Sequence, residues 1–351
     1  MDTKLFDYHL PEDLIAQVPL ENRDESRLMV VNKSSGEISH LIFKDIVKIL
    51  EPEDCLVLNT TKVFPGRLLG KKSETGGKVE LLLLERQGES RWLALTGGAR
   101  IKEGTEIEFP GKDLKALVEM KPSIGRAVIR FTSRNGRGVT DERVFEAGNI
   151  PLPPYIKNPQ IDVRRYQTVY SRREISAAAP TAGLHFTIGL LSEIRRKGVK
   201  IAEIELAVGA DTFTPVRTEN IEDHKMHSEW FKVDENCASL VNNCTGRVIA
   251  VGTTVVRALE TAAMKAKTRA KDTAEKPLRV LPHEGRTDLF IKPGHEFQAV
   301  DAIITNFHFP RSTLLFLVCA FGGIELIMRA YKIAVEKRYR FYSFGDAMFI
   351  Y

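Results

Sequence analysis

A chain of 351 residues is longer than one ordinary compact core, which predicts two domains unless it closes a single large α/β barrel. Hydrophobic residues make up 43% and charged residues 28%, as in soluble globular proteins, and no apolar run approaches the roughly 20 residues that span a bilayer. The net charge of +5 fits a polyanionic partner without requiring one, so the distribution of charge matters more than its total.

The start of the chain and its cysteines bear on location. Residues 1–6 lack the basic start and apolar core of a signal peptide. The four cysteines lie in apolar or helical contexts without the paired spacing of a metal site; they are Cys55, Cys237, Cys244 and Cys319. We therefore expect a monomeric cytoplasmic protein with reduced thiols, no bound metal and no membrane association.

The N-terminal part of the chain ends in a buried strand followed by polar residues. Residues 10–16 predict a short helix with proline in its first turn. The continuous apolar run at 55–59 predicts a strand buried on both faces of a sheet. Thr60 and Thr61 follow it directly, and open α/β sheets place ligands at this end of a strand.

From about residue 67 the sequence changes to short strand-like runs. These runs, separated by glycine-containing turns, fill residues 67–131 and predict a small antiparallel barrel or sandwich. A proline-rich stretch at 150–156 forbids helix and reads as the return linker. We expect residues 1–62 and 150–351 to form an α/β barrel-like main domain, and residues 63–149 to form an inserted β-barrel domain.

Guanidinium groups and aromatic rings are interleaved after this linker. The cluster contains Arg164, Arg165, Tyr166, Tyr170, Arg172 and Arg173. Phosphate contact and base stacking both use this pairing of residue types, which makes the cluster a candidate RNA-binding surface. A solvated surface with two core tyrosines would give the same pattern.

Residues 178–187 form the loop around which the rest of the chain is organised. Small residues, one proline and Gly183 allow a close approach to its backbone, and His185 titrates near neutrality. Thr187 can cap the helix that follows. The loop is therefore a candidate site for an anion or a substrate carboxylate, and the alternative is a tight structural turn with a buried histidine.

Two later strand-to-helix turns have the same logic. The apolar run at 247–251 ends at Thr253 and Thr254, and the run at 302–306 is followed by His308. Converging turns of this kind form the ligand-binding end of an α/β barrel or sheet. Residues 265–279 are charged and predict a mobile surface segment.

His224, His227 and Glu229 lie close enough in sequence to be considered as metal ligands. Their spacing matches no strong zinc signature, and no cysteine is nearby. Hydrogen bonding to a substrate, or a structural role, is the better interpretation.

These segments resemble the S-adenosylmethionine:tRNA ribosyltransferase-isomerases of queuosine biosynthesis, the QueA family. The matching strings cover nearly the whole chain in the family's order; they include Phe6–Tyr8, Leu14–Gln17, Leu56–Asn59, Tyr166–Tyr170, Ala178–Thr187, Gly252–Thr254, Thr305–His308 and Gly345–Met348. Several such strings are far more specific than a lone glycine motif.

The resemblance implies an enzyme that transfers and isomerises the ribosyl part of S-adenosylmethionine. The acceptor is the aminomethyl-deazaguanine wobble base of tRNA, and the products are epoxyqueuosine-tRNA, adenine and methionine. S-adenosylmethionine is consumed as a substrate, so no cofactor is expected. An RNA methyltransferase is disfavoured because the chain has no glycine-rich first strand-to-helix turn.

The resemblance and the chemistry together nominate site residues. The sulfonium acidifies the ribose 5′ hydrogens, so the reaction needs a base and assistance to the leaving adenine. His185 and His308 are the candidates for proton transfer, and either could instead position substrate or pack in the core. The candidates for substrate binding are Thr181, Gly183, Thr253, Thr254 and Asn306, and those for tRNA phosphates are Arg164, Arg165, Arg172 and Arg173.

The chain departs from the family at a second small-residue turn. Ala207 stands where the family usually has histidine, and Asp211 where it usually has glycine. Loss of a potential base and gain of a carboxylate could lower activity. The alternative function is therefore a catalytically impaired tRNA-binding protein of the same fold.

Overall fold

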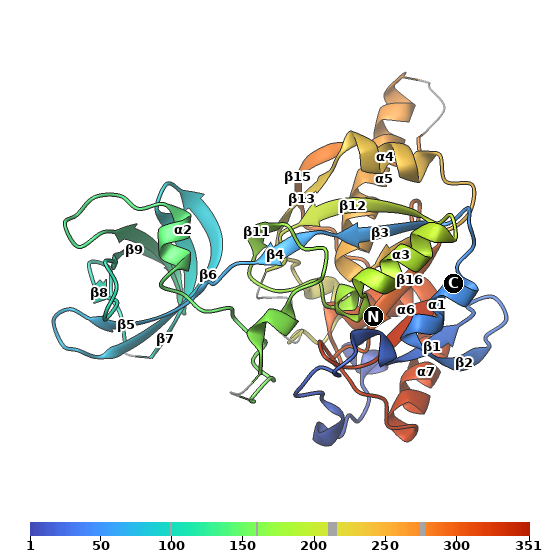
Figure 1. Ribbon diagram of the computed structural model, residues 1–351, viewed down its shortest axis with the longest axis horizontal. Helices are drawn as coiled ribbons and strands as arrows, with labels where there is room; N and C mark the ends of the chain where they lie inside the picture. Colours follow the sequence, from blue (N-terminus) through green and yellow to red (C-terminus); the bar gives the residue numbers. More distant parts are fainter. Residues whose placement is uncertain (99, 159–160, 210–215, 274–277) are drawn as a thin grey trace. The chain divides into compact units, whose positions relative to one another are not determined.

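The computed structural model describes residues 1–351 apart from 99, 159–160, 210–215 and 274–277 (Figure 1). The chain divides into two compact units. One contains Met1–Lys62, Pro154–Arg173 and Ala179–Tyr351, and the other contains Val63–Pro153 and Glu174–Ala178.

The first unit is built on a mixed sheet, which has nine strands among the described residues, in the order β15-β13-β12-β3-β14-β16-β17-β1-β2. Its strands are β1 (Arg27–Val31), β2 (Ile38–Ile42), β3 (Cys55–Asn59), β12 (Lys200–Leu206), β13 (Glu229–Val233), β14 (Val248–Val251), β15 (His283–Thr287), β16 (Ala302–Asn306) and β17 (Ala347–Ile350). The central strands β12, β3, β14 and β16 run parallel, so their carboxyl ends meet at one edge.

The α/β barrel-like architecture expected for this unit is wrong, because the sheet is open. A barrel of that type needs every strand parallel to its neighbours and the last strand bonded to the first. Here β13 is antiparallel to β12 and β15, β17 is antiparallel to β16, and β2 is antiparallel to β1. The edge strand β2 exposes Ser39 and His40 to solvent, as an uncovered edge requires.

Helices cover both faces of this sheet. They are α1 (Ile46–Ile49), α3 (Ile188–Arg196), α4 (Glu235–Asn242), α5 (Thr253–Thr273), α6 (Thr313–Gly322) and α7 (Ile324–Glu336). Leu190 and Ile194 of α3 pack with Leu56 and Leu58 of β3 in the main core cluster. The alternate β3 residues point to the other face, where α5 packs. The long helix α5 includes residues 265–273, so the described part of the segment that was expected to be mobile is helical (Figure 1).

Short 3-10 helices complete the first unit: η1 (Thr3–Phe6), η2 (Glu12–Leu14), η3 (Arg23–Glu25), η4 (Phe43–Asp45), η5 (Val163–Tyr166), η6 (Thr181–His185) and η8 (Ile221–Asp223). In the described residues, no single helix is long and apolar enough to cross a membrane. The pair α6 and α7 passes that test of length and composition only when joined across a bend of 117°.

The second unit is a closed antiparallel barrel in the order β10-β7-β6-β5-β8-β9, and the prediction of an inserted antiparallel barrel is confirmed. It contains β5 (Arg67–Lys72), β6 (Lys78–Gly88), β7 (Arg91–Gly98), β8 (Glu106–Glu108), β9 (Lys115–Ser123), β10 (Arg126–Thr132) and the short helix α2 (Asp141–Phe145). The alternating residues Val79, Leu81 and Leu83 of β6 fill its interior. A two-stranded sheet pairs β4 (Thr61–Val63) with β11 (Arg173–Ser176).

Asp54 ties the starts of two central strands together. Its carboxylate accepts hydrogen bonds from the Arg247 backbone N–H at 2.9 Å and from Arg247 Nη2 at 2.6 Å, immediately before β14. It also accepts from the Glu51 N–H at 2.9 Å. Burial alone would raise the pKa of Asp54, but these hydrogen bonds and the Arg247 charge outweigh burial and hold the pKa below its ordinary value.

We expect Asp54→Asn to lower the free energy of unfolding at pH 7 by about 3 kcal/mol, because it leaves Arg247 without its carboxylate. A lowered pKa contributes stability above the ordinary aspartate value of about 3.9, and that stability is lost as the pH falls through the folded value. Urea unfolding of both proteins at several pH values measures the effect. A difference that does not shrink in acid would contradict this account.

Candidate active site

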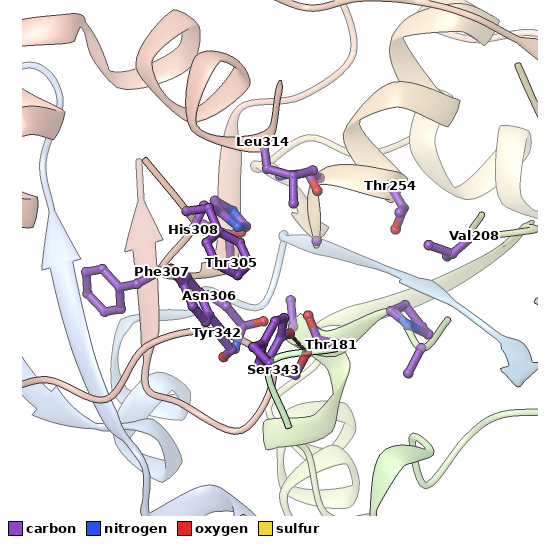
Figure 2. Close-up of a pocket in the computed structure, with 17 residues that line it drawn as sticks. Thr181, Val208, Thr254, Thr305, Asn306, Phe307, His308, Leu314, Tyr342 and Ser343 are labelled. Atoms are coloured by element: carbon purple, nitrogen blue, oxygen red, sulfur yellow. Dashed lines mark hydrogen bonds between the residues drawn. The ribbon is translucent and has the colours of Figure 1, made fainter. Parts of the chain in front are cut away.

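A cavity lies at the carboxyl ends of the parallel strands in the first unit. The empty space in it measures about 590 Å³ when the opening to solvent is included. Its walls come from three turns, residues 179–182, 252–254 and 305–309, together with Val208, Tyr155, Leu314, Tyr342 and Ser343. Figure 2 shows Thr254 and Val208 across the cavity from Asn306 and His308. The three turns singled out in the sequence therefore meet at one place.

Asn306 is the last residue of β16, and its amide is held in one orientation. Its Nδ2 donates to His185 Nε2 at 3.0 Å and to the Tyr342 carbonyl at 3.2 Å. Its Oδ1 is buried and has no hydrogen-bond partner among the residues that the structure describes. A buried oxygen without a partner is costly, so Oδ1 is prepared to accept a hydrogen bond from a ligand in the cavity.

His185 lies behind Asn306 and is not one of the residues that line this cavity. Since its Nε2 accepts from Asn306, its Nδ1 carries the proton, which it donates to Ser26 Oγ at 2.7 Å. The ring stacks on Phe43 with centroids 4.9 Å apart. Burial, and then the charges of Arg340 and Arg23, lower the pKa of His185 to about 3, so the imidazole is neutral.

His308 does line the cavity. Its Nε2 lies 2.8 Å from Thr305 Oγ1, and its backbone N–H donates to the Tyr331 hydroxyl at 3.0 Å. The Tyr8 hydroxyl donates to its carbonyl, so the residue is held from both sides of its backbone. Burial lowers the pKa of His308 to about 3, which makes it a neutral imidazole facing the ligand space.

Of the other predicted substrate-binding residues, three line the cavity and one does not. Thr181, Thr253 and Thr254 line the cavity, and Thr254 Oγ1 is a second buried oxygen without a partner in the described part of the chain. Gly183 does not line the cavity. A Cβ at Gly183 would lie 2.0 Å from the Tyr170 hydroxyl, so this glycine is required by the close approach of Tyr170.

Aromatic rings that sequence reasoning missed form one wall. Phe309 and Tyr342 stack with centroids 3.6 Å apart, and Tyr155 packs against both at 5.3 Å and 4.9 Å. Tyr155 comes from the proline-rich linker and Tyr342 from the loop before β17. In the sequence, the aromatic residues of those two segments are the one feature that could have indicated this wall.

The four predicted RNA-binding arginines differ in their partners. Arg164 pairs with Asp162 at 2.9 Å, Arg172 with Glu203 at 2.7 Å and Arg173 with Glu205 at 2.7 Å. Arg165 instead donates to the Leu20 carbonyl at 2.6 Å. Of the two interleaved tyrosines, Tyr166 is fully buried in the core.

The residues considered as metal ligands have other partners. Glu229 accepts from Arg257, which is also buried, and from the Gly209 N–H at 2.8 Å. Burial alone would raise the pKa of Glu229, but Arg257 and then His227 hold it at about 2. No cluster of three or more His, Cys, Asp or Glu side chains suited to a metal occurs in the described ranges.

Of the two departures from the family at this turn, Ala207 bonds to the residue that follows Glu229. Ala207 follows β12 directly, and its N–H donates to the Trp230 carbonyl at 2.9 Å. Asp211 lies outside the described residues.

Comparison with known proteins identifies the family. A family model described as queuosine biosynthesis protein matches residues 3–350. The chain is 50% identical to the S-adenosylmethionine:tRNA ribosyltransferase-isomerase of Thermoanaerobacter sp. strain X514, over 98% of each chain. It is also 50% identical to the protein of that name from Carboxydothermus hydrogenoformans, over 100% of each.

A crystal structure of S-adenosylmethionine tRNA ribosyltransferase from Thermotoga maritima matches with a TM-score of 0.53 at 37% identity, covering 99% of this chain and 100% of that one. Sequence, family model and solved structure therefore agree, and the chain belongs to the S-adenosylmethionine:tRNA ribosyltransferase-isomerase family of queuosine biosynthesis.

Proposed function

We propose that this protein transfers and isomerises the ribosyl moiety of S-adenosylmethionine onto the aminomethyl-deazaguanine wobble base of tRNA. The products are epoxyqueuosine-tRNA, adenine and methionine. Family membership over nearly the whole chain supports the reaction. The observation that carries the assignment to this site is a pair of buried oxygens, Asn306 Oδ1 and Thr254 Oγ1, which have no hydrogen-bond partner among the described residues and belong to residues that line one cavity.

The cavity walls suit the groups that the reaction brings together. Asn306 Oδ1 and Thr254 Oγ1 accept hydrogen bonds, as hydroxyl and amino groups of a ribose or a base require. The rings of Tyr155, Phe309 and Tyr342 offer faces for a flat heterocycle or for the positively charged sulfonium. Thr181 and Thr253 also line the cavity and add short polar side chains that can contact the substrate.

The two histidines take different parts in this proposal. His308 faces the ligand space and is the residue that contacts the substrate. Because its pKa is about 3, it accepts a hydrogen bond or a proton as a neutral imidazole and is a weak base, so the sulfonium must supply most of the acidity of the ribose carbon. His185 is a positioning residue that acts through Asn306.

Arg164, Arg172 and Arg173 stay candidates for tRNA phosphates through exchange of partners. Each now pairs with an exposed or half-buried carboxylate, and surface ion pairs of this kind are worth roughly 0–1 kcal/mol. A phosphate can therefore replace the carboxylate at little cost. The protein is expected to act as a monomer, on tRNA and S-adenosylmethionine.

The first experiment incubates purified protein with S-adenosylmethionine and tRNA bearing the aminomethyl-deazaguanine base. We expect stoichiometric adenine release together with epoxyqueuosine, detected by chromatography and nucleoside mass. Unmodified tRNA is the control and should release no adenine. Tight binding without either product would overturn the enzymatic proposal and favour the impaired tRNA-binding alternative raised by Ala207 and Asp211.

The pH dependence tests the state of His308. With a pKa of about 3 this residue stays neutral from about pH 5 to 8, so kcat/KM should show no acid limb near the ordinary histidine value of about 6.5. His308→Gln should lower kcat by about 100-fold or more, while the exposed His9→Gln should not. An acid limb near pH 6.5 that disappears in His308→Gln would refute the neutral assignment.

A double-mutant cycle tests how His185 acts. Asn306→Ala should lower kcat/KM by roughly 10- to 100-fold, the loss expected for one hydrogen bond to the reacting ligand. His185→Ala should cost nearly as much, and the double variant should be no worse than Asn306→Ala alone. His185→Gln keeps an acceptor near the Nε2 position and should recover activity. Additive losses would mean that His185 acts independently of Asn306.

A further inference from the structure

A second cavity lies on the other side of His185. It encloses about 300 Å³ including its opening, and its walls include Arg23, Ser26, Arg165, His185 and Ser343. Ser343 also lines the first cavity, so a molecule filling both would pass this serine. No aspartate or glutamate is among the described residues that line it.

Two guanidinium groups, those of Arg23 and Arg165, line this cavity, and their recorded side-chain hydrogen bonds go to backbone carbonyls rather than to carboxylates of the described residues. Arg23 Nη1 donates to the Gln167 carbonyl at 2.7 Å, Arg165 Nη2 to the Leu20 carbonyl at 2.6 Å, and Arg340 to the Val18 carbonyl. Within the described residues, Arg165 Nε and Arg340 Nη1 are buried and have no hydrogen-bond partner at all. The neutral carbonyls orient these side chains without neutralising their charge, and only for Arg340 does a carboxylate, that of Asp346, offset part of it.

The charges of Arg23 and Arg165 are close enough to oppose each other. Burial, and then the neighbouring Arg165, lower the pKa of Arg23, and burial lowers the pKa of Arg340 although Asp346 partly offsets it. Like charges held in a partly buried space raise the free energy of the unliganded protein. An anion placed between them would remove that repulsion and satisfy the free N–H groups.

We propose that Arg23 and Arg165, with Arg340 behind them, bind one phosphodiester of the RNA substrate next to the nucleotide that enters the first cavity. The inference rests on the proposed function. The alternative anion is the carboxylate of S-adenosylmethionine, but its α-ammonium group would then lie among guanidiniums in a cavity whose described walls carry no carboxylate. A phosphodiester has no such cation, and its oxygens match the guanidinium fork.

The test measures binding of an anticodon stem-loop RNA carrying the aminomethyl-deazaguanine base, without S-adenosylmethionine. Arg165→Gln should weaken binding by roughly 10- to 100-fold and reduce the slope of log K against log salt concentration by about 0.7. Arg196→Gln removes the same charge from the exposed end of α3 and should change neither. In turnover assays KM for RNA should rise in Arg165→Gln while KM for S-adenosylmethionine stays unchanged.

Neutral methylphosphonate linkages locate the contact. Replacing loop phosphates one at a time should reveal a linkage whose neutralisation weakens binding to the wild type but has no further effect on Arg165→Gln. If Arg165→Gln does not fold, the binding of RNA to Arg165→Lys and the methylphosphonate series on the wild type test the proposal instead. A series in which no loop linkage affects binding would overturn it.

The remaining outcomes are equally decisive. A raised KM for S-adenosylmethionine with unchanged RNA affinity would assign the cavity to the methionine carboxylate instead and overturn the phosphodiester site. Unchanged RNA and S-adenosylmethionine parameters would overturn any anion role for Arg165. A wild type that binds no RNA would overturn the proposed function as well, whereas RNA binding that is insensitive to Arg165→Gln would overturn this inference alone.

Discussion

The hydrogen bond from Asn306 Nδ2 to His185 Nε2 is the constraint on which the rest of the site depends. It joins the end of β16 to η6, two segments far apart in the sequence, at the edge where the parallel strands finish. Ser26 holds the far side of the imidazole, so the chain of three side chains has one direction of donation. That direction leaves Asn306 Oδ1 free to accept a hydrogen bond, and it connects Asn306, which lines the first cavity, with His185 and Ser26, which line the second.

The positions of the cavity-lining turns could be predicted from sequence, because a buried strand needs an apolar run and its end needs polar groups. Thr253 and Asn306 follow such runs, and both reach the cavity. The inserted barrel could also be predicted, because glycine-containing turns separate its short strands in the sequence. The open edge of the main sheet was not, because an apolar run such as residues 347–350 does not encode whether it pairs parallel or antiparallel; β17 does both, with β1 and with β16.

The roles of single side chains were harder to predict for the same reason. Glu203 and Glu205 alternate along β12 and capture Arg172 and Arg173, yet nothing near those arginines in the sequence indicates the pairing. Gly183 shows a different limit. The small residues around Gly183 suggested that a ligand approaches its backbone, whereas the hydroxyl of Tyr170 fills the space that a side chain at this position would need. A glycine that makes room for another part of the protein and a glycine that makes room for a ligand look the same in the sequence.

The two cavities are also linked through charge. Protonation of His185 at Nε2 would set two donors against each other and favour rotation of the Asn306 amide, which would present Nδ2 instead of Oδ1 to the first cavity. Arg340 and Arg23, together with burial, prevent this by keeping the pKa of His185 near 3. Burial therefore preserves the hydrogen-bonding polarity of the first cavity, and the guanidiniums of Arg340 and Arg23 add to its effect. An anion that neutralised part of their charge would raise that pKa, but burial, the largest cause of the shift, would still keep the imidazole neutral.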